Sequence, residues 1–164
     1  MRARNAENRI KEDGKLIKYI DIILILVMLV WTGAQDIRSG EINIVIPLCI
    51  AGFDLLVRSF CGRIDAADVF EGAAIGAVVM VLSVMTKESI GMGDGVILLC
   101  TGAMSGFEKN MELFFSALIL CGMCGLFLVL VLRKSRKTKV PFVPFLLAAF
   151  GIMEMISLSS GVLL

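Results

Sequence analysis

The chain has no histidine, and its cysteines occur only once in a spacing that metal sites use. Catalysis by a histidine base is therefore excluded. Cys121 and Cys124 form that single C-x-x-C in the middle of an apolar run, and no second ligand pair exists, so we predict no zinc or other metal site and no cofactor. The five cysteines lie mostly in apolar segments and are expected to pack as small apolar side chains: Cys49, Cys61, Cys100, Cys121 and Cys124.

An excess of charge of either sign is also missing. The chain has sixteen Lys and Arg residues and fifteen Asp and Glu residues, which gives a net charge of +1. The basic residues stand at the ends of apolar runs rather than along one polar face, so we predict no nucleic-acid partner. Hydrophobic residues make up 58% of the chain, above the roughly 45–50% of ordinary soluble domains, and the mean hydropathy is +0.91. This composition predicts an integral membrane protein.

No long polar linker divides the sequence, so we expect one domain over residues 1–164, with a polar tail at 1–15. A helix needs about 20 apolar residues to cross a bilayer. Counted against that length, the sequence predicts an all-α bundle of about six transmembrane helices in a multi-pass membrane protein. The first apolar run is too long for a signal peptide and is expected to be retained. The expected spans are 16–35, 42–60, 69–85, 95–107, 113–132 and 140–163, the fourth being short.

The distribution of basic residues predicts the orientation. The most basic loop holds five positive charges and is placed in the cytoplasm by the positive-inside rule: Arg133, Lys134, Arg136, Lys137 and Lys139. Counting back two spans at a time puts Asp94 and then Asp36 on the same cytoplasmic side. The same count sends the basic amino terminus outside, against the rule.

Asp36 and Asp94 are the two acids at the inner ends of apolar segments. A carboxylate within a span costs roughly 2.5–3.5 kcal/mol, so each is a candidate functional residue. Two such groups suffice for peptide hydrolysis, one ionised to take a proton from water and one protonated to polarise the carbonyl. Gly91 and Gly93 allow a tight turn and the close approach of a substrate backbone. The structural alternatives are a helix N-cap for Asp94 and a solvated helix end for Asp36.

The other acids in or near apolar segments are expected toward the outer half, where they can pair or reach the interface. Asp54 lies four residues before Arg58 and so on the same helical face. The spacings Gly72-x-x-x-Gly76 and Gly102-x-x-x-Gly106 are interpreted as helix-packing sites. This outer set of acids comprises Asp21, Asp54, Asp68, Glu71 and Glu154.

Gly91-Met92-Gly93-Asp94 resembles the G-x-G-D motif of intramembrane aspartic proteases, and Asp36, just after the first span, resembles the partner acid of the type IV prepilin peptidases. The segment after Asp36 departs from that family, because Ile42-Asn43-Ile44 stands where the family has Ile-Pro-Asn. Pro141-Phe142-Val143-Pro144-Phe145 is similar to the family's proline-rich entry to the last span. The resemblance covers nearly the whole chain.

The resemblance implies an aspartic endopeptidase of the cytoplasmic membrane of a bacterium or archaeon. Its substrate would be a prepilin or pseudopilin, cut at the cytoplasmic leader, and membrane lipid would be its surroundings. The loop after Asp36 is too short for the methyltransferase insertion of larger members, so we expect cleavage without methylation. The compact format resembles the peptidases of tight-adherence (Tad) pilus systems.

Two other classes of protein fit the intramembrane acids. A small proton-coupled transporter or channel would need acids that line a continuous path through the membrane. A non-catalytic assembly protein would need none of them for chemistry. Charges near the candidate dyad are interpreted as interfacial rather than catalytic: Arg38, Glu41, Lys87 and Glu88.

Overall fold

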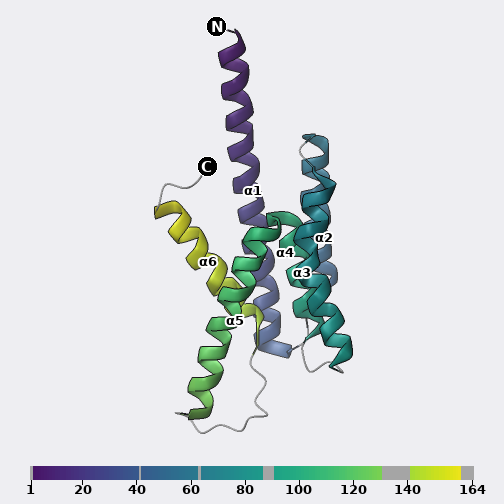
Figure 1. Cartoon of the computed structure of the whole chain (residues 1–164), viewed down its shortest axis with the longest axis vertical. Coiled ribbons are helices and arrows are strands. Elements are labelled where there is room, and N and C mark those ends of the chain that lie inside the picture. Colours follow the sequence, from purple (N-terminus) through teal and green to yellow (C-terminus); the bar gives the residue numbers. More distant parts are fainter. Residues whose placement is uncertain (1, 41, 63, 87–90, 131–140, 160–164) are drawn as a thin grey trace.

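A computed structural model describes residues 2–40, 42–62, 64–86, 91–130 and 141–159, with side chains from residue 16 onward except that of residue 129. Over these ranges the chain forms six helices and no strand, as predicted for an all-α bundle. Figure 1 shows the helices running alternately up and down. They are α1 (Arg2–Ser39), α2 (Val45–Phe60), α3 (Ala66–Met85), α4 (Met92–Ser105), α5 (Phe107–Leu130) and α6 (Val143–Ser159).

Three stretches of helix are long and apolar enough to cross a membrane, namely Leu16–Ser39, Ala66–Met85 and Phe107–Leu128. The two helices Met92–Ser105 and Val143–Ser159 are apolar but shorter. At 1.5 Å per residue, the 14 residues of α4 rise only about 21 Å, less than the roughly 30 Å of hydrocarbon. Most of α4 is buried against the other helices, so its backbone is covered by protein rather than by lipid.

Glycines bring α3 and α4 into backbone contact. A Cβ atom on Gly102 would lie 1.9 Å from the carbonyl oxygen of Gly72, and a Cβ atom on Gly76 would lie 2.1 Å from the backbone nitrogen of Leu99. No side chain larger than glycine fits at these distances. The predicted role of the glycine pairs in packing is confirmed, because Gly106 also approaches Gly72.

A buried amide joins three helices. The Oδ1 atom of Asn110 on α5 accepts a hydrogen bond of 2.9 Å from the hydroxyl of Thr101 on α4. Its Nδ2 atom donates to the carbonyl oxygens of Gly72 (3.2 Å) and Leu98 (2.9 Å). Asn110 is fully buried, so these bonds supply the partners that a polar group needs in an apolar interior.

Several helix boundaries differ from the expected spans. Helix α1 extends back to Arg2, so the expected polar tail continues the first helix; its Ala, Glu, Lys and Arg residues are good helix formers. Helix α2 begins at Val45, whose N–H donates to the Oδ1 atom of Asn43. Helix α5 begins at Phe107 rather than at 113, because Gly106, with a φ of 85°, ends α4 immediately before it.

Candidate functional site

Asp36 lies in the last turn of α1 and is half-buried. Its Oδ2 atom accepts a hydrogen bond of 3.2 Å from the backbone N–H of Val143, the first residue of α6. A carboxylate is favoured beside the N–H groups at a helix N-terminus. One turn earlier, Gly33 packs against Val143, which brings α1 and α6 together at this point. The carboxyl group is therefore tied to α6 as well as to its own helix.

Asp94 lies in the first turn of α4 and is also half-buried. The N-cap position belongs to Gly91, whose backbone is extended, and the N–H of Asp94 donates to the Gly91 carbonyl oxygen at 3.1 Å. The explanation of Asp94 as an N-cap is thus wrong. The carboxyl group folds back over Gly91, where a Cβ atom would lie 2.8 Å from Oδ2 of Asp94. Only glycine leaves space for the acid in this position.

The two acids lie at the same end of the bundle. Asp36 stands in the last turn of α1 and Asp94 in the first turn of α4. In Figure 1 the end of α1 and the starts of α4 and α6 lie together toward the lower end of the molecule. The prediction from span parity that both acids share one end is confirmed, although they come from positions 58 residues apart in the sequence.

Apolar side chains pack against the glycines on either side of Asp94. A Cβ atom on Gly93 would lie 3.0 Å from the side chain of Ile42, and one on Gly95 would lie 2.6 Å from the side chain of Met80 on α3. Cys121 and Cys124 are free thiols, and the described residues hold no cluster of three or more metal ligands. The geometry places two carboxyl groups in a partly apolar setting, which is what shared-proton chemistry requires.

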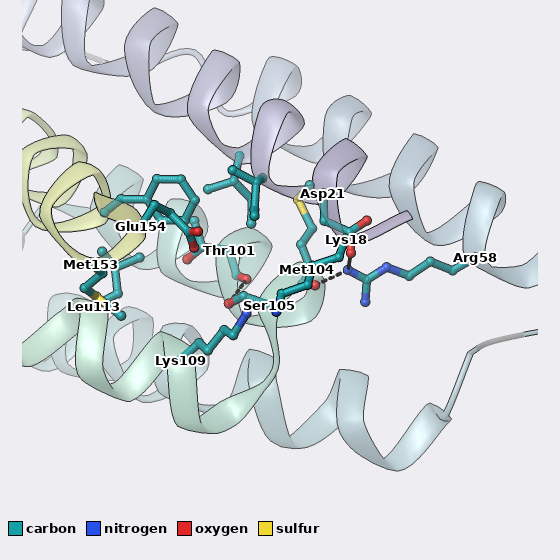
Figure 2. Close-up of a pocket in the computed structure, with 13 residues that line it drawn as sticks. Lys18, Asp21, Arg58, Thr101, Met104, Ser105, Lys109, Leu113, Met153 and Glu154 are labelled. Carbon is teal, nitrogen blue, oxygen red and sulfur yellow. Dashed lines mark hydrogen bonds and ion pairs between the residues drawn. The ribbon is translucent and has the colours of Figure 1, made fainter. Parts of the chain in front are cut away.

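The opposite end of the bundle contains an ionic cluster. The predicted pair is confirmed, since Nε of Arg58 lies 3.0 Å from Oδ2 of Asp54. The Nη2 atom of Arg58 also contacts Oδ2 of Asp21 on α1 at 2.6 Å and donates to the carbonyl oxygen of Met104 on α4. Sequence spacing gave no signal for Asp21, which lies 37 residues from Arg58. Figure 2 shows Arg58 reaching Asp21 at the edge of a pocket that Glu154 also lines.

This cluster is separate from the two candidate acids. Asp21 and Asp36 lie on the same helix 15 residues apart, a rise of about 22 Å. The remaining acids of the expected outer set, Asp68 and Glu71, are exposed on α3. Arg38 is exposed near Asp36. Other charges considered from the sequence lie outside the described residues: Glu41, Lys87, Glu88 and the basic loop from 133 to 139.

A family model described as the type IV leader peptidase family matches residues 23–126, more than half of the chain and a range that includes both Asp36 and Asp94. The chain belongs to the type IV leader peptidase family. It is therefore a peptidase, and its apolar helices make it a membrane protein. Searches of curated proteins and of solved structures found no match. The family description points to pilin-type substrates in general.

Proposed function

We propose that this leader peptidase is an intramembrane aspartic endopeptidase that uses Asp36 and Asp94 as its catalytic pair. One observation carries the proposal: two half-buried carboxyl groups, one in the last turn of α1 and one in the first turn of α4, lie at the same end of the bundle. Ionisable groups are costly among apolar helices, and acids near each other resist simultaneous ionisation. Hydrolysis by two aspartates needs one of them protonated and the other ionised.

In this mechanism the ionised aspartate accepts a proton from a water molecule as the water oxygen bonds to the carbonyl carbon of the scissile peptide. The protonated aspartate donates a hydrogen bond, and then its proton, to the carbonyl oxygen. The resulting gem-diol collapses as a proton passes to the leaving nitrogen and the C–N bond breaks. The N–H of Val143 holds Oδ2 of Asp36, which fixes the orientation of that carboxyl group during the cycle.

The substrate we propose is a prepilin or pseudopilin with a short cytoplasmic leader. Gly91 and Gly93 keep bulk away from the backbone beside Asp94, so an extended peptide can approach the carboxyl group closely. The enzyme would act from the cytoplasmic side of a bacterial or archaeal cytoplasmic membrane, in a Tad-type pilus system. Only a few residues separate α1 from α2, so we propose cleavage without methyl transfer.

The arrangement of the acids supports a peptidase over a proton-coupled transporter. A relay would need titratable groups spaced along the membrane path. Between Asp21 and Asp36 on α1, the buried positions are Ile25, Met28, Leu29 and Gly33, together with Thr32, and none of them is titratable. The hydroxyl of Thr32 donates to the backbone of its own helix. The acids thus form two groups at opposite ends rather than a path.

Co-expression with a candidate prepilin tests the proposal. Wild type is expected to shorten the prepilin, whereas Asp36→Asn and Asp94→Asn each abolish processing because the amide cannot exchange the proton. Asp68→Asn, an exposed acid on α3, is the matched control and is expected to retain processing. Processing that survives either dyad substitution removes the model. Incubation with S-adenosylmethionine tests the second claim, since methylated pilin would contradict it.

A further inference from the structure

A pocket of about 180 Å³ lies at the end of the bundle opposite Asp36 and Asp94. Its apolar lining includes Ile22, Leu113 and Phe150, and its charged lining residues are Lys18, Asp21, Arg58, Lys109 and Glu154. The volume is well below the roughly 300–1,000 Å³ of sites that enclose a whole drug-sized ligand. A small polar group attached to a longer apolar body fits such a space, with the apolar body remaining outside.

Lys109 and Glu154 carry opposite charges in this pocket, where Arg58 is already paired with Asp21 and Lys18 is a further cation of the lining. Lys109 stands on α5 and Glu154 on α6, and neither forms an ion pair with a residue that the structure describes. They line the same pocket, and no ion pair within 4.0 Å is described between them. Figure 2 shows Lys109 of α5 and Glu154 of α6 among the residues that line the pocket. A ligand with one negative and one positive group would satisfy both.

The position of the pocket along the helices indicates that its ligand is a membrane lipid. Lys109 lies in the first turns of α5, Ser105 is the last residue of α4, and Glu154 lies within two turns of the end of α6. These ends belong to one side of the bundle, where apolar helices give way to the polar layer of the membrane. The wall beside them is fixed by Arg58, which joins α1, α2 and α4 through Asp21, Asp54 and the Met104 carbonyl.

We infer that this pocket binds the head group of a zwitterionic phospholipid with a primary ammonium, phosphatidylethanolamine in chemical class. Lys109 contacts the phosphate, Glu154 accepts hydrogen bonds from the ammonium, and the acyl chains lie along the apolar wall and the surrounding helices. A quaternary ammonium has no N–H to donate, and an anionic glycerol head group has no cation for Glu154. The site therefore prefers ethanolamine over choline and glycerol head groups. This inference does not depend on the proposed function at the other end.

Native mass spectrometry of the whole chain in mild detergent tests the preference, with an equimolar mixture of phosphatidylethanolamine, phosphatidylcholine and phosphatidylglycerol. We expect the ethanolamine lipid to be retained about tenfold over the others, the size of one charged hydrogen bond. Glu154→Gln is expected to remove the preference. Lys109→Gln weakens retention of all three lipids, and Lys109→Arg restores it. Glu112→Gln, an exposed acid on α5 that lines no part of this pocket, is the matched control.

A competition experiment separates head group from acyl chains. Soluble glycerophosphoethanolamine at millimolar concentration is expected to displace the lipid, and glycerophosphocholine is not. Thermal melting of each variant in the same detergent checks that the fold is retained. Equal retention of all three lipids, preference for the anionic lipid, or an unchanged preference in a folded Glu154→Gln protein would overturn the inference.

Discussion

Replacing Gly102 by alanine should separate α3 from α4, because the new methyl group would lie 1.9 Å from the carbonyl oxygen of Gly72. Ordinary contact begins at 3.4 Å, so the two backbones must move apart by about 1.5 Å. Neither atom belongs to a flexible side chain that could turn away. Overpacking of this kind costs about 1–3 kcal/mol, and alanine recovers at most about 1 kcal/mol through its helix propensity. We expect a net loss of about 1–2 kcal/mol in the free energy of unfolding.

Cys100 provides the assay for this loss. Its thiol is fully buried within α4, two residues from Gly102. In a background in which the other four cysteines are replaced by alanine, a thiol-reactive dye reports the temperature at which α4 loses its packing. Gly102→Ala is expected to lower this midpoint by about 5 °C. Gly122→Ala on α5, with nothing within 4 Å of its Cβ position, is the control and should not lower it. Equal midpoints for the two variants would refute the backbone contact.

Three further substitutions test other parts of the structure. Asn110→Ala removes three buried hydrogen bonds and is expected to cost about 2–4 kcal/mol, measured by the same dye assay; a loss below 1 kcal/mol would contradict the network. Arg58→Met leaves Asp21 and Asp54 without their shared cation and is expected to cost about 3–5 kcal/mol, whereas Arg58→Lys costs less; equal losses would argue against a charge effect. Gly91→Ala should block prepilin processing while the protein stays folded, because the methyl group displaces the Asp94 carboxyl group; Gly52→Ala, at an open position on α2, should process normally.

The sequence predicted those features that depend on local pattern. The lengths of the apolar segments predicted six helices, and the number of spans between Asp36 and Asp94 predicted that both acids lie at the same end. Helical spacing alone predicted the Asp54 and Arg58 pair, because residues four apart share a face. Each of these depends on neighbours within one helix, or on the alternation of helix direction, and needs no knowledge of how helices pack.

Features that depend on packing between helices were not predictable. Nothing in the spacing linked Asp21 to Arg58, and nothing marked Asn110 as the residue that joins three helices. From its length alone, α4 is too short to cross the bilayer. The structure shows that the neighbouring helices cover most of it, so its backbone does not have to span the lipid by itself. The start of α5 lies six residues before the predicted 113, because Gly106 completes the turn and the polar residues after Phe107 are already helical.

The two candidate acids are held by different pairs of helices. Asp94 is part of α4. This helix packs on α3 at both ends, through Gly95 against Met80 and through Gly102 against Gly72. Asp36 is part of α1, and its carboxyl group joins α1 to α6 through the hydrogen bond from the Val143 N–H. The separation of the carboxyl groups therefore depends on how the α1–α6 pair sits against the α3–α4 pair. We therefore expect substitutions within the α3–α4 contact to act mainly on Asp94, and substitutions where α1 meets α6 to act mainly on Asp36. In the proposed mechanism, an approach of the two carboxyl groups would therefore require a change in how these two helix pairs pack on each other.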